Sequence, residues 1–215
     1  MGYFASRHQQ PPSQLRAATS DVGSKRRPRQ EDPTVPDPTP VDPATVPQLQ
    51  GIFAPVHDEV DGDLEVVQGK IPDDLVGTYL RNGPNPAFPP LGSFTYPLDG
   101  DGMVHRFSFA DGRATYRNRY VHTPALDAEL DAGRALWGGV MTPHFPGADE
   151  VGPDLADQDK EIPDIHVVRH AGRTLALPEG QLPFQLDDEL ATVGQSTDFD
   201  GGLTTGMCAH PGDAG

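Results

Sequence analysis

The chain has 215 residues, of which 35% are hydrophobic, and its net charge is −16. This length suffices for one domain with a hydrophobic core, and the acidic balance argues against nucleic-acid binding. Glycine and proline contribute 24 residues each, which is typical of turn-rich β structure or of a disordered portion. No apolar run reaches the length of a membrane span. The single cysteine, Cys208, excludes an internal disulfide and predicts a reducing, cytoplasmic location.

Residues 1–47 are predicted to form a disordered, proline-rich arm. They have no hydrophobic period and include the run Pro33-Thr34-Val35-Pro36-Asp37-Pro38-Thr39-Pro40. Basic residues gather in the first 30 positions, so the remainder is more acidic than the net charge indicates. Arg26-Arg27 is not followed by an apolar segment, which argues against a twin-arginine export signal. The folded domain is predicted to occupy residues 48–215.

From Gly51 onward, short alternating apolar segments separated by turn residues predict an all-β domain. The expected strands are 64–67, 78–80, 103–109, 114–121, 166–170, 174–177, 183–186 and 191–193. Asp111-Gly112 and Ala171-Gly172 indicate tight hairpin turns. Consecutive hairpins of similar spacing are typical of propeller blades whose sequence repeat has been lost.

The strand pattern is interrupted between residues 124 and 165. Residues 125–136 predict a helix with Leu126, Leu130 and the Leu136-Trp137 pair on one side. Residues 138–164 predict a long loop, and a loop of that length inside a domain is often functional. We therefore expect a helical and loop insertion in the β domain.

Three short motifs follow one another along the domain. They are Tyr79-Leu80-Arg81-Asn82-Gly83-Pro84-Asn85-Pro86, Asp99-Gly100-Asp101-Gly102-Met103-Val104-His105 and Met207-Cys208-Ala209-His210-Pro211. A residue before proline is excluded from the helical region, so the first motif predicts extended or turn backbone. In this order the motifs resemble the carotenoid cleavage oxygenase family. That family includes carotenoid and apocarotenoid dioxygenases, lignostilbene dioxygenases and the retinal-pigment-epithelium isomerohydrolase.

The resemblance covers residues 53–211 and implies a seven-bladed β-propeller. At about 45 residues per blade, seven blades need about 300 residues, so we expect only the first blades here, with the C-terminal blades missing. The implied activity is that of a non-haem iron(II) dioxygenase. It would use O2 to cleave a conjugated C=C bond of a carotenoid, apocarotenoid or stilbene to carbonyl products. The segment 125–165 would help to cap the substrate tunnel.

The resemblance also implies a metal site. The family holds Fe(2+) with four histidines, and the first lies in an Ala-His-Pro motif, which maps onto His210. Neutral imidazoles are good iron ligands and leave the ion its full charge. Glutamates hold the ligating histidines of the family, and the first of them maps onto Glu179. A carboxylate that accepts the outer imidazole proton fixes the tautomer and raises ligand basicity. The remaining three iron ligands are expected in the absent blades.

Other residues are given non-catalytic roles. His105 is expected to be a hydrogen-bonded structural histidine and not a ligand. His166 stands where many relatives carry asparagine. It shares a strand face with His170, and both are interpreted as structural or surface groups. Pro178 stands where relatives often have an aromatic residue, and we expect it to loosen the strand that presents Glu179.

Two alternatives to the enzyme remain open. The chain could be a metal-free β-propeller binding or scaffold protein, or an inactive truncated product. A simple extracytoplasmic binding protein is disfavoured because no signal peptide is seen. Hydrophobic polyene or stilbene substrates suggest peripheral membrane contact. The sequence determines neither the substrate nor the oligomeric state.

Overall fold

The computed structural model describes residues 38–94, 99–195, 199, 201–203 and 205–211. All of the described residues lie in one compact unit. The predicted disorder of residues 1–37 therefore concerns a part of the chain outside the described residues.

Residues 38–47, which the composition assigned to the same arm, have a defined backbone. The Val41 amide donates to the Pro90 carbonyl, and the Gly92 amide donates to the Thr39 carbonyl, both at 2.8 Å. Each bond joins positions far apart in the chain. Local composition, which predicts disorder for this stretch, carries no information about such contacts.

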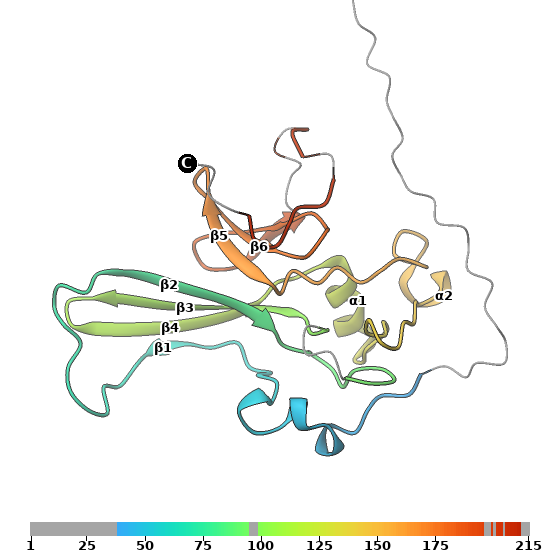
Figure 1. The fold of residues 1–215 in the computed structure, drawn as a ribbon, viewed down its shortest axis with the longest axis horizontal. Helices are drawn as coiled ribbons and strands as arrows, with labels where there is room; N and C mark the ends of the chain where they lie inside the picture. The colour runs from blue at the N-terminus through green and yellow to red at the C-terminus, as the bar shows by residue number, and fades with distance from the viewer. Residues whose placement is uncertain (1–37, 95–98, 196–198, 200, 204, 212–215) are drawn as a thin grey trace, which may run out of the picture. The chain divides into compact units, whose positions relative to one another are not determined.

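The described residues form two four-stranded antiparallel sheets, in the strand orders β1-β4-β3-β2 and β5-β6-β7-β8 (Figure 1). The elements are η1 (Pro43–Thr45), η2 (Pro47–Leu49), η3 (Gly51–Phe53), β1 (Asp61–Asp63), β2 (Gly77–Pro84), β3 (Gly102–Ala110), β4 (Arg113–Tyr120), α1 (Pro124–Ala132), α2 (Ala148–Val151), β5 (His166–His170), β6 (Arg173–Leu177), β7 (Phe184–Leu186) and β8 (Thr192–Gln195). The predicted all-β class with a helical insertion is confirmed. In the described residues, no helix is long and apolar enough to cross a membrane.

Both predicted hairpin turns are present. Asp111 and Gly112 have φ values of 51° and 69°, and Ala171 and Gly172 have values of 48° and 78°. Two consecutive positive φ values characterise the type I′ turn, whose twist matches that of the flanking strands. The turns therefore set the register of β3 against β4 and of β5 against β6.

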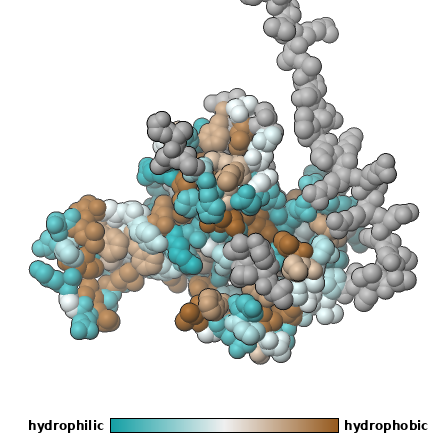
Figure 2. Space-filling view, viewed as in Figure 1, coloured by the Kyte–Doolittle hydropathy of each residue, from teal (hydrophilic) through white to brown (hydrophobic). Residues whose placement is uncertain are grey.

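The predicted strand at 64–67 is wrong. The strand in this region is β1, which ends at Asp63, and the Leu64 amide makes a last bond to the Ala114 carbonyl at 2.8 Å. The alternating apolar residues that suggested a strand stay at the surface, with Val67 92% exposed. Figure 2 shows further apolar residues at the surface near the start of β2, where Val76 is 71% exposed. Alternating apolar and polar residues predict a strand only where another layer of the protein covers the apolar side chains.

The predicted helix is present but shorter than expected. Helix α1 is capped by Thr123, whose hydroxyl accepts from the Leu126 amide at 3.0 Å. It ends at Gly133, which takes the left-handed conformation with φ 66°. Leu130 is 46% exposed, so the expected common apolar face with Leu126 is wrong. Leu136 is buried beyond the helix end, in a small core that belongs to the insertion.

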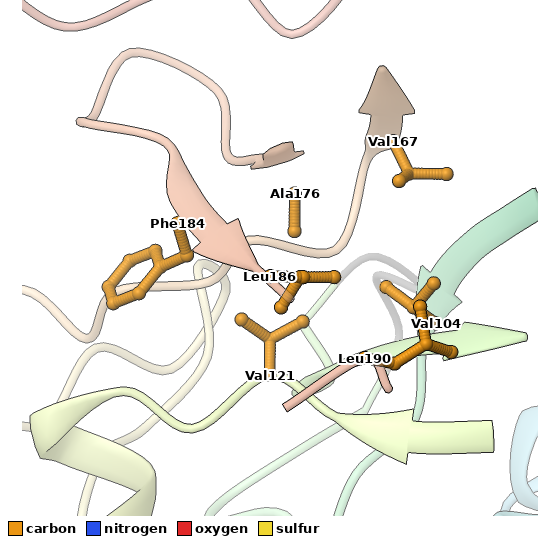
Figure 3. Close-up of a cluster of buried hydrophobic side chains, with 7 residues drawn as sticks. All are labelled: Val104, Val121, Val167, Ala176, Phe184, Leu186 and Leu190. Carbon is orange, nitrogen blue, oxygen red and sulfur yellow. The ribbon is translucent and has the colours of Figure 1, made fainter. Parts of the chain in front are cut away.

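The two sheets pack together around one apolar cluster, drawn in Figure 3. Its buried members are Val104, Val121, Val167, Ala176, Phe184, Leu186 and Leu190. Leu80 of β2 packs against this cluster from the first sheet. Full burial of each valine, leucine or phenylalanine side chain stabilises a fold by about 1.5–3 kcal/mol. The cluster therefore holds β5 and its hairpin partner against the first sheet.

The two asparagines of the Asn-Gly-Pro-Asn motif each join β2 to another segment through hydrogen bonds of the side-chain amide. The Asn85 amide group is buried, and it donates to the Val56 carbonyl and accepts from the Val56 amide, both at 2.7 Å. The Asn82 amide group donates to the carbonyls of Pro163 at 2.8 Å and His166 at 3.0 Å. The first asparagine ties β2 to the chain before β1, and the second ties β2 to the start of β5.

An ammonium group lies between two buried carboxylates where the insertion meets the first sheet. Lys160 Nζ is 2.6 Å from Asp101 Oδ1 and 2.6 Å from Glu129 Oε2. Glu129 Oε1 accepts from the Leu136 amide at 2.8 Å, and Asp101 Oδ2 accepts from the Ala87 amide at 3.0 Å. Burial lowers the pKa of Lys160, but the two carboxylates outweigh this effect and raise the pKa above its ordinary value. The pair of ion contacts therefore joins α1, the start of β3 and the segment that leads to β5.

Asp164 is buried beside this ion cluster, and among the described residues its Oδ2 atom has no hydrogen-bond partner. Burial raises its pKa to about 8, and the nearby charges of Asp101 and Asp99 add to the increase. At neutral pH the carboxyl group is therefore mostly protonated. A neutral acid avoids placing a third negative charge in this region.

We predict that Lys160→Met destabilises the complete protein by about 3–5 kcal/mol, because the buried carboxylates of Asp101 and Glu129 lose their counter-ion. The measurement is the free energy of unfolding in urea. Lys70→Met is the matched control, since Lys70 is exposed and its loss should cost less than about 0.5 kcal/mol. Equal unfolding free energies for the two variants would contradict a stabilising role for the cluster.

The raised pKa of Asp164 predicts that the free energy of unfolding depends on pH. Between about pH 4 and pH 8 the unfolded chain has lost this proton and the folded chain retains it, so its contribution to stability falls as the pH rises. Asp164→Asn cannot titrate. Relative to the wild type, the variant should gain about 2.5–3 kcal/mol between pH 5 and pH 7, measured as unfolding free energies. Parallel pH profiles for the two proteins would show that Asp164 is ionised in the folded state.

Candidate metal centre

The segment that carries His210 is attached to the turn after β6. The Gly180 amide donates to the Met207 carbonyl at 3.0 Å, and the Met207 amide donates to the Gln181 carbonyl at 2.9 Å. Ala209 is fully buried, whereas its neighbour His210 is exposed. The backbone is thus anchored on the sheet, and the imidazole projects from it into solvent.

Gly206 permits this attachment. A Cβ atom on Gly206 would lie 1.8 Å from the Gly180 carbonyl oxygen and 2.2 Å from its carbon. No side chain other than hydrogen fits at that separation. The close approach of the two backbones explains why a glycine precedes the Met-Cys-Ala-His-Pro motif.

Glu179 lies beside the His210 segment. Its Oε2 atom accepts from the Ala209 amide at 3.4 Å, which is longer than the usual range of about 2.7–3.2 Å and indicates a weak hydrogen bond. Strand β6 ends at Leu177, so Pro178 and Glu179 form the exit from the sheet. The structure therefore brings Glu179 to the backbone next to His210, and a bond from Glu179 to an imidazole remains a prediction.

His166 is the residue near His210 that the sequence pattern did not identify. The ring centroids of His166 and His210 are 5.8 Å apart, and the ring planes are inclined by 37°. His170, on the same strand, instead contacts Phe199 edge-on at 6.0 Å. No local signal predicts this contact, because His166 and His210 belong to segments that meet only in the folded chain.

His105 lies on the other sheet and has the expected hydrogen bond. Its Nδ1 atom is 2.7 Å from the Tyr116 hydroxyl, and the two rings are stacked with centroids 6.0 Å apart. Burial lowers the pKa of His105, and the charge of Arg81 lowers it further. His105 is therefore a neutral member of an aromatic face that also includes Phe107.

Whether this region can bind a metal ion depends on the donor side chains of the described residues. In the described residues, no three or more His, Cys, Asp or Glu side chains lie close enough to hold one ion. His210 nevertheless suits the role of a single ligand, because it is exposed and its imidazole makes no hydrogen bond to any described residue. The described residues could thus supply one imidazole ligand, and they do not form a metal site by themselves.

The insertion encloses a small cavity beside the ion cluster. Its volume is about 30 Å³, and Asp99, Glu129, Trp137 and Lys160 are among its lining residues. A cavity of this size holds a water molecule, not a polyene. A large apolar ligand would therefore not fit in this cavity.

Comparison with known proteins places the chain in a family. Residues 53–213 match the family described as retinal pigment epithelial membrane protein. The chain belongs to this family, the carotenoid cleavage oxygenases, as its three motifs indicate. The two sheets are accordingly blades of the β-propeller of the family.

Individual relatives agree with this assignment. The carotenoid cleavage oxygenase of Mycobacterium tuberculosis is 44% identical over 168 residues, which cover 77% of this chain and 30% of the relative. The isoeugenol monooxygenase of Pseudomonas nitroreducens is 35% identical over 167 residues, which cover 77% of this chain and 34% of the relative. The crystal structure of the lignostilbene dioxygenase of Pseudomonas brassicacearum matches with a TM-score of 0.67 and 32% identity, covering 83% of this chain and 35% of that chain. The chain thus spans about a third of the length of each relative.

We predict that Gly206→Ala displaces the segment that carries His210. Overpacking of this kind costs about 1–3 kcal/mol, so protection of the Met207 and Gly180 amides from hydrogen exchange should fall by about tenfold or more. Gly62→Ala is the matched control, because an added Cβ there meets nothing within 4 Å. Unchanged amide protection in Gly206→Ala would show that the two backbones are not in contact.

Proposed function

We propose that the whole protein is an iron(II)-dependent dioxygenase, which cleaves a conjugated C=C bond of a carotenoid, apocarotenoid or stilbene to two carbonyl products. The observation that carries the proposal is the family match over residues 53–213, which includes His210 and its supporting sheet. Relatives named as a carotenoid cleavage oxygenase and a lignostilbene dioxygenase support this substrate class.

In this proposal His210 is one of the iron ligands. Its exposed imidazole can offer a nitrogen lone pair to a metal ion, and the anchored Ala209 backbone limits the positions that the ring can reach. Ferrous iron, when bound, supplies the redox chemistry with O2. The other ligands would come from parts of the protein beyond the described residues.

Glu179 is proposed to orient the metal site. In the structure it accepts from the Ala209 amide, and this contact adds to the backbone bonds of Met207 that direct the chain toward His210. A carboxylate that also accepts a proton from a ligating imidazole would select its tautomer. Replacement of such a supporting group costs about 10–100-fold in metal affinity or activity.

The insertion at 125–165 is proposed to cover the substrate. It has its own core around Leu136 and Trp137, and Lys160 fixes it to the first sheet. An apolar substrate of this class also supports a proposal of peripheral membrane contact. The single cysteine, Cys208, supports placing the protein in the cytoplasm.

The test is the iron content and product formation of the complete protein. His210→Ala should lose at least about 10-fold in iron affinity, and Glu179→Gln should lose about 10–100-fold. Iron is measured by mass spectrometry after dialysis, and cleavage products are measured by chromatography with a stilbene and an apocarotenoid. His57→Ala is the control, because His57 is exposed and lies outside the proposed site.

Each outcome separates the candidate functions. Full iron occupancy in His210→Ala would remove that residue from the ligand set. A wild-type protein that binds no ferrous iron and cleaves neither substrate would instead support the metal-free binding or scaffold protein.

A further inference from the structure

We infer that His166 is a positioning residue for the imidazole of His210. The inference rests on the proposed ligand role of His210 and adds a residue that the family motif does not contain. It starts from the contact between the two rings, whose centroids are 5.8 Å apart at an inclination of 37°. This separation lies within the range of favourable aromatic pairs, about 4.5–7 Å.

His166 is itself held in place by the backbone on both sides. As the first residue of β5 it pairs with Leu177 of β6. Its carbonyl oxygen also accepts from the Asn82 amide group of β2 at 3.0 Å. The next residue, Val167, is buried in the apolar cluster between the sheets. The Cα atom of His166 is therefore fixed by two sheets, and its exposed ring extends from a rigid support.

The described residues place no comparable backbone restraint on the ring of His210. The bonds that hold its segment end at the backbones of Met207 and Ala209. Glu179 reaches the Ala209 amide, and in the described part of the chain it makes no bond to the His210 imidazole. Contact with His166 is thus the interaction through which the described residues limit the side-chain rotation of His210.

Restricting that rotation matters for metal retention. A ligand held in one rotamer loses less conformational entropy when the ion binds, so the ion binds more tightly, and an imidazole that detaches returns to the ion sooner, which slows release. An aromatic pair of this kind corresponds to a change of about three- to tenfold in an equilibrium or rate constant. A histidine elsewhere on β5 does not restrict the His210 ring in this way, because His170, on the same strand, contacts Phe199 instead.

The experiment measures the rate at which the iron-loaded, complete protein releases Fe(2+) to a colorimetric chelator. His166→Ala should release iron about three- to tenfold faster than the wild type. His166→Phe retains a ring without a nitrogen and should remain within about twofold of the wild type. His170→Ala is the matched control, since it removes an exposed imidazole from the same strand, and it should leave the rate unchanged. Circular dichroism establishes that each variant is folded.

Two results would overturn the inference. Release from His166→Ala at the rate of His170→Ala would show that the ring contact has no effect. Release from His166→Phe as fast as from His166→Ala would show that the nitrogen matters and that ring packing does not position His210. His210→Ala tests the proposed function separately. If that variant retains iron, the ligand role itself fails, whatever the His166 variants do.

Discussion

The buried ammonium of Lys160 is the constraint on which the arrangement of this chain depends. It pairs at one point with both Asp101 at the start of β3 and Glu129 on α1, each at 2.6 Å. Two buried carboxylates without this cation would repel each other in a medium that screens charge poorly. Because Lys160 also precedes the segment that leads to β5, the same contact sets where the second sheet begins.

The neighbouring contacts extend this constraint toward the candidate metal centre. Gly102 lies so close to the Pro163 carbonyl that an added Cβ would be 2.3 Å from its oxygen. The amide of Asn82 binds the carbonyls of Pro163 and His166, which flank the entry into β5. The Asp-Gly-Asp-Gly and Asn-Gly-Pro-Asn motifs therefore both contact the stretch of chain that enters β5. Together these contacts fix the backbone position of His166.

The candidate metal centre lies where the ends of the second sheet meet the following segment. Glu179 leaves β6, His166 enters β5, and both lie beside the segment that ends in His210. A site of this construction has rigid backbone on one side and exposed imidazoles on the other. Such a surface can supply one ligand to an ion that other parts of a protein also hold.

Several features could be read from the sequence because each depends on a few consecutive residues. Asp111-Gly112 and Ala171-Gly172 each place glycine at the second of two positive-φ positions, a conformation that glycine tolerates, so the hairpins and their registers were predictable. The order of the three motifs indicated the family, and the family match over residues 53–213 agrees. The strand expected at 64–67 failed because alternation does not show whether another layer covers the strand.

The sequence alone thus determined the all-β class, the hairpins, the family and the candidacy of His210. Only the tertiary structure decided that Lys160 joins Asp101 to Glu129 and that His166, not His170, lies against His210. The physical reason is that the two kinds of interaction act over different separations along the chain. Turn and strand preferences act between neighbouring residues, whereas ion pairs and ring contacts depend on how separate segments pack.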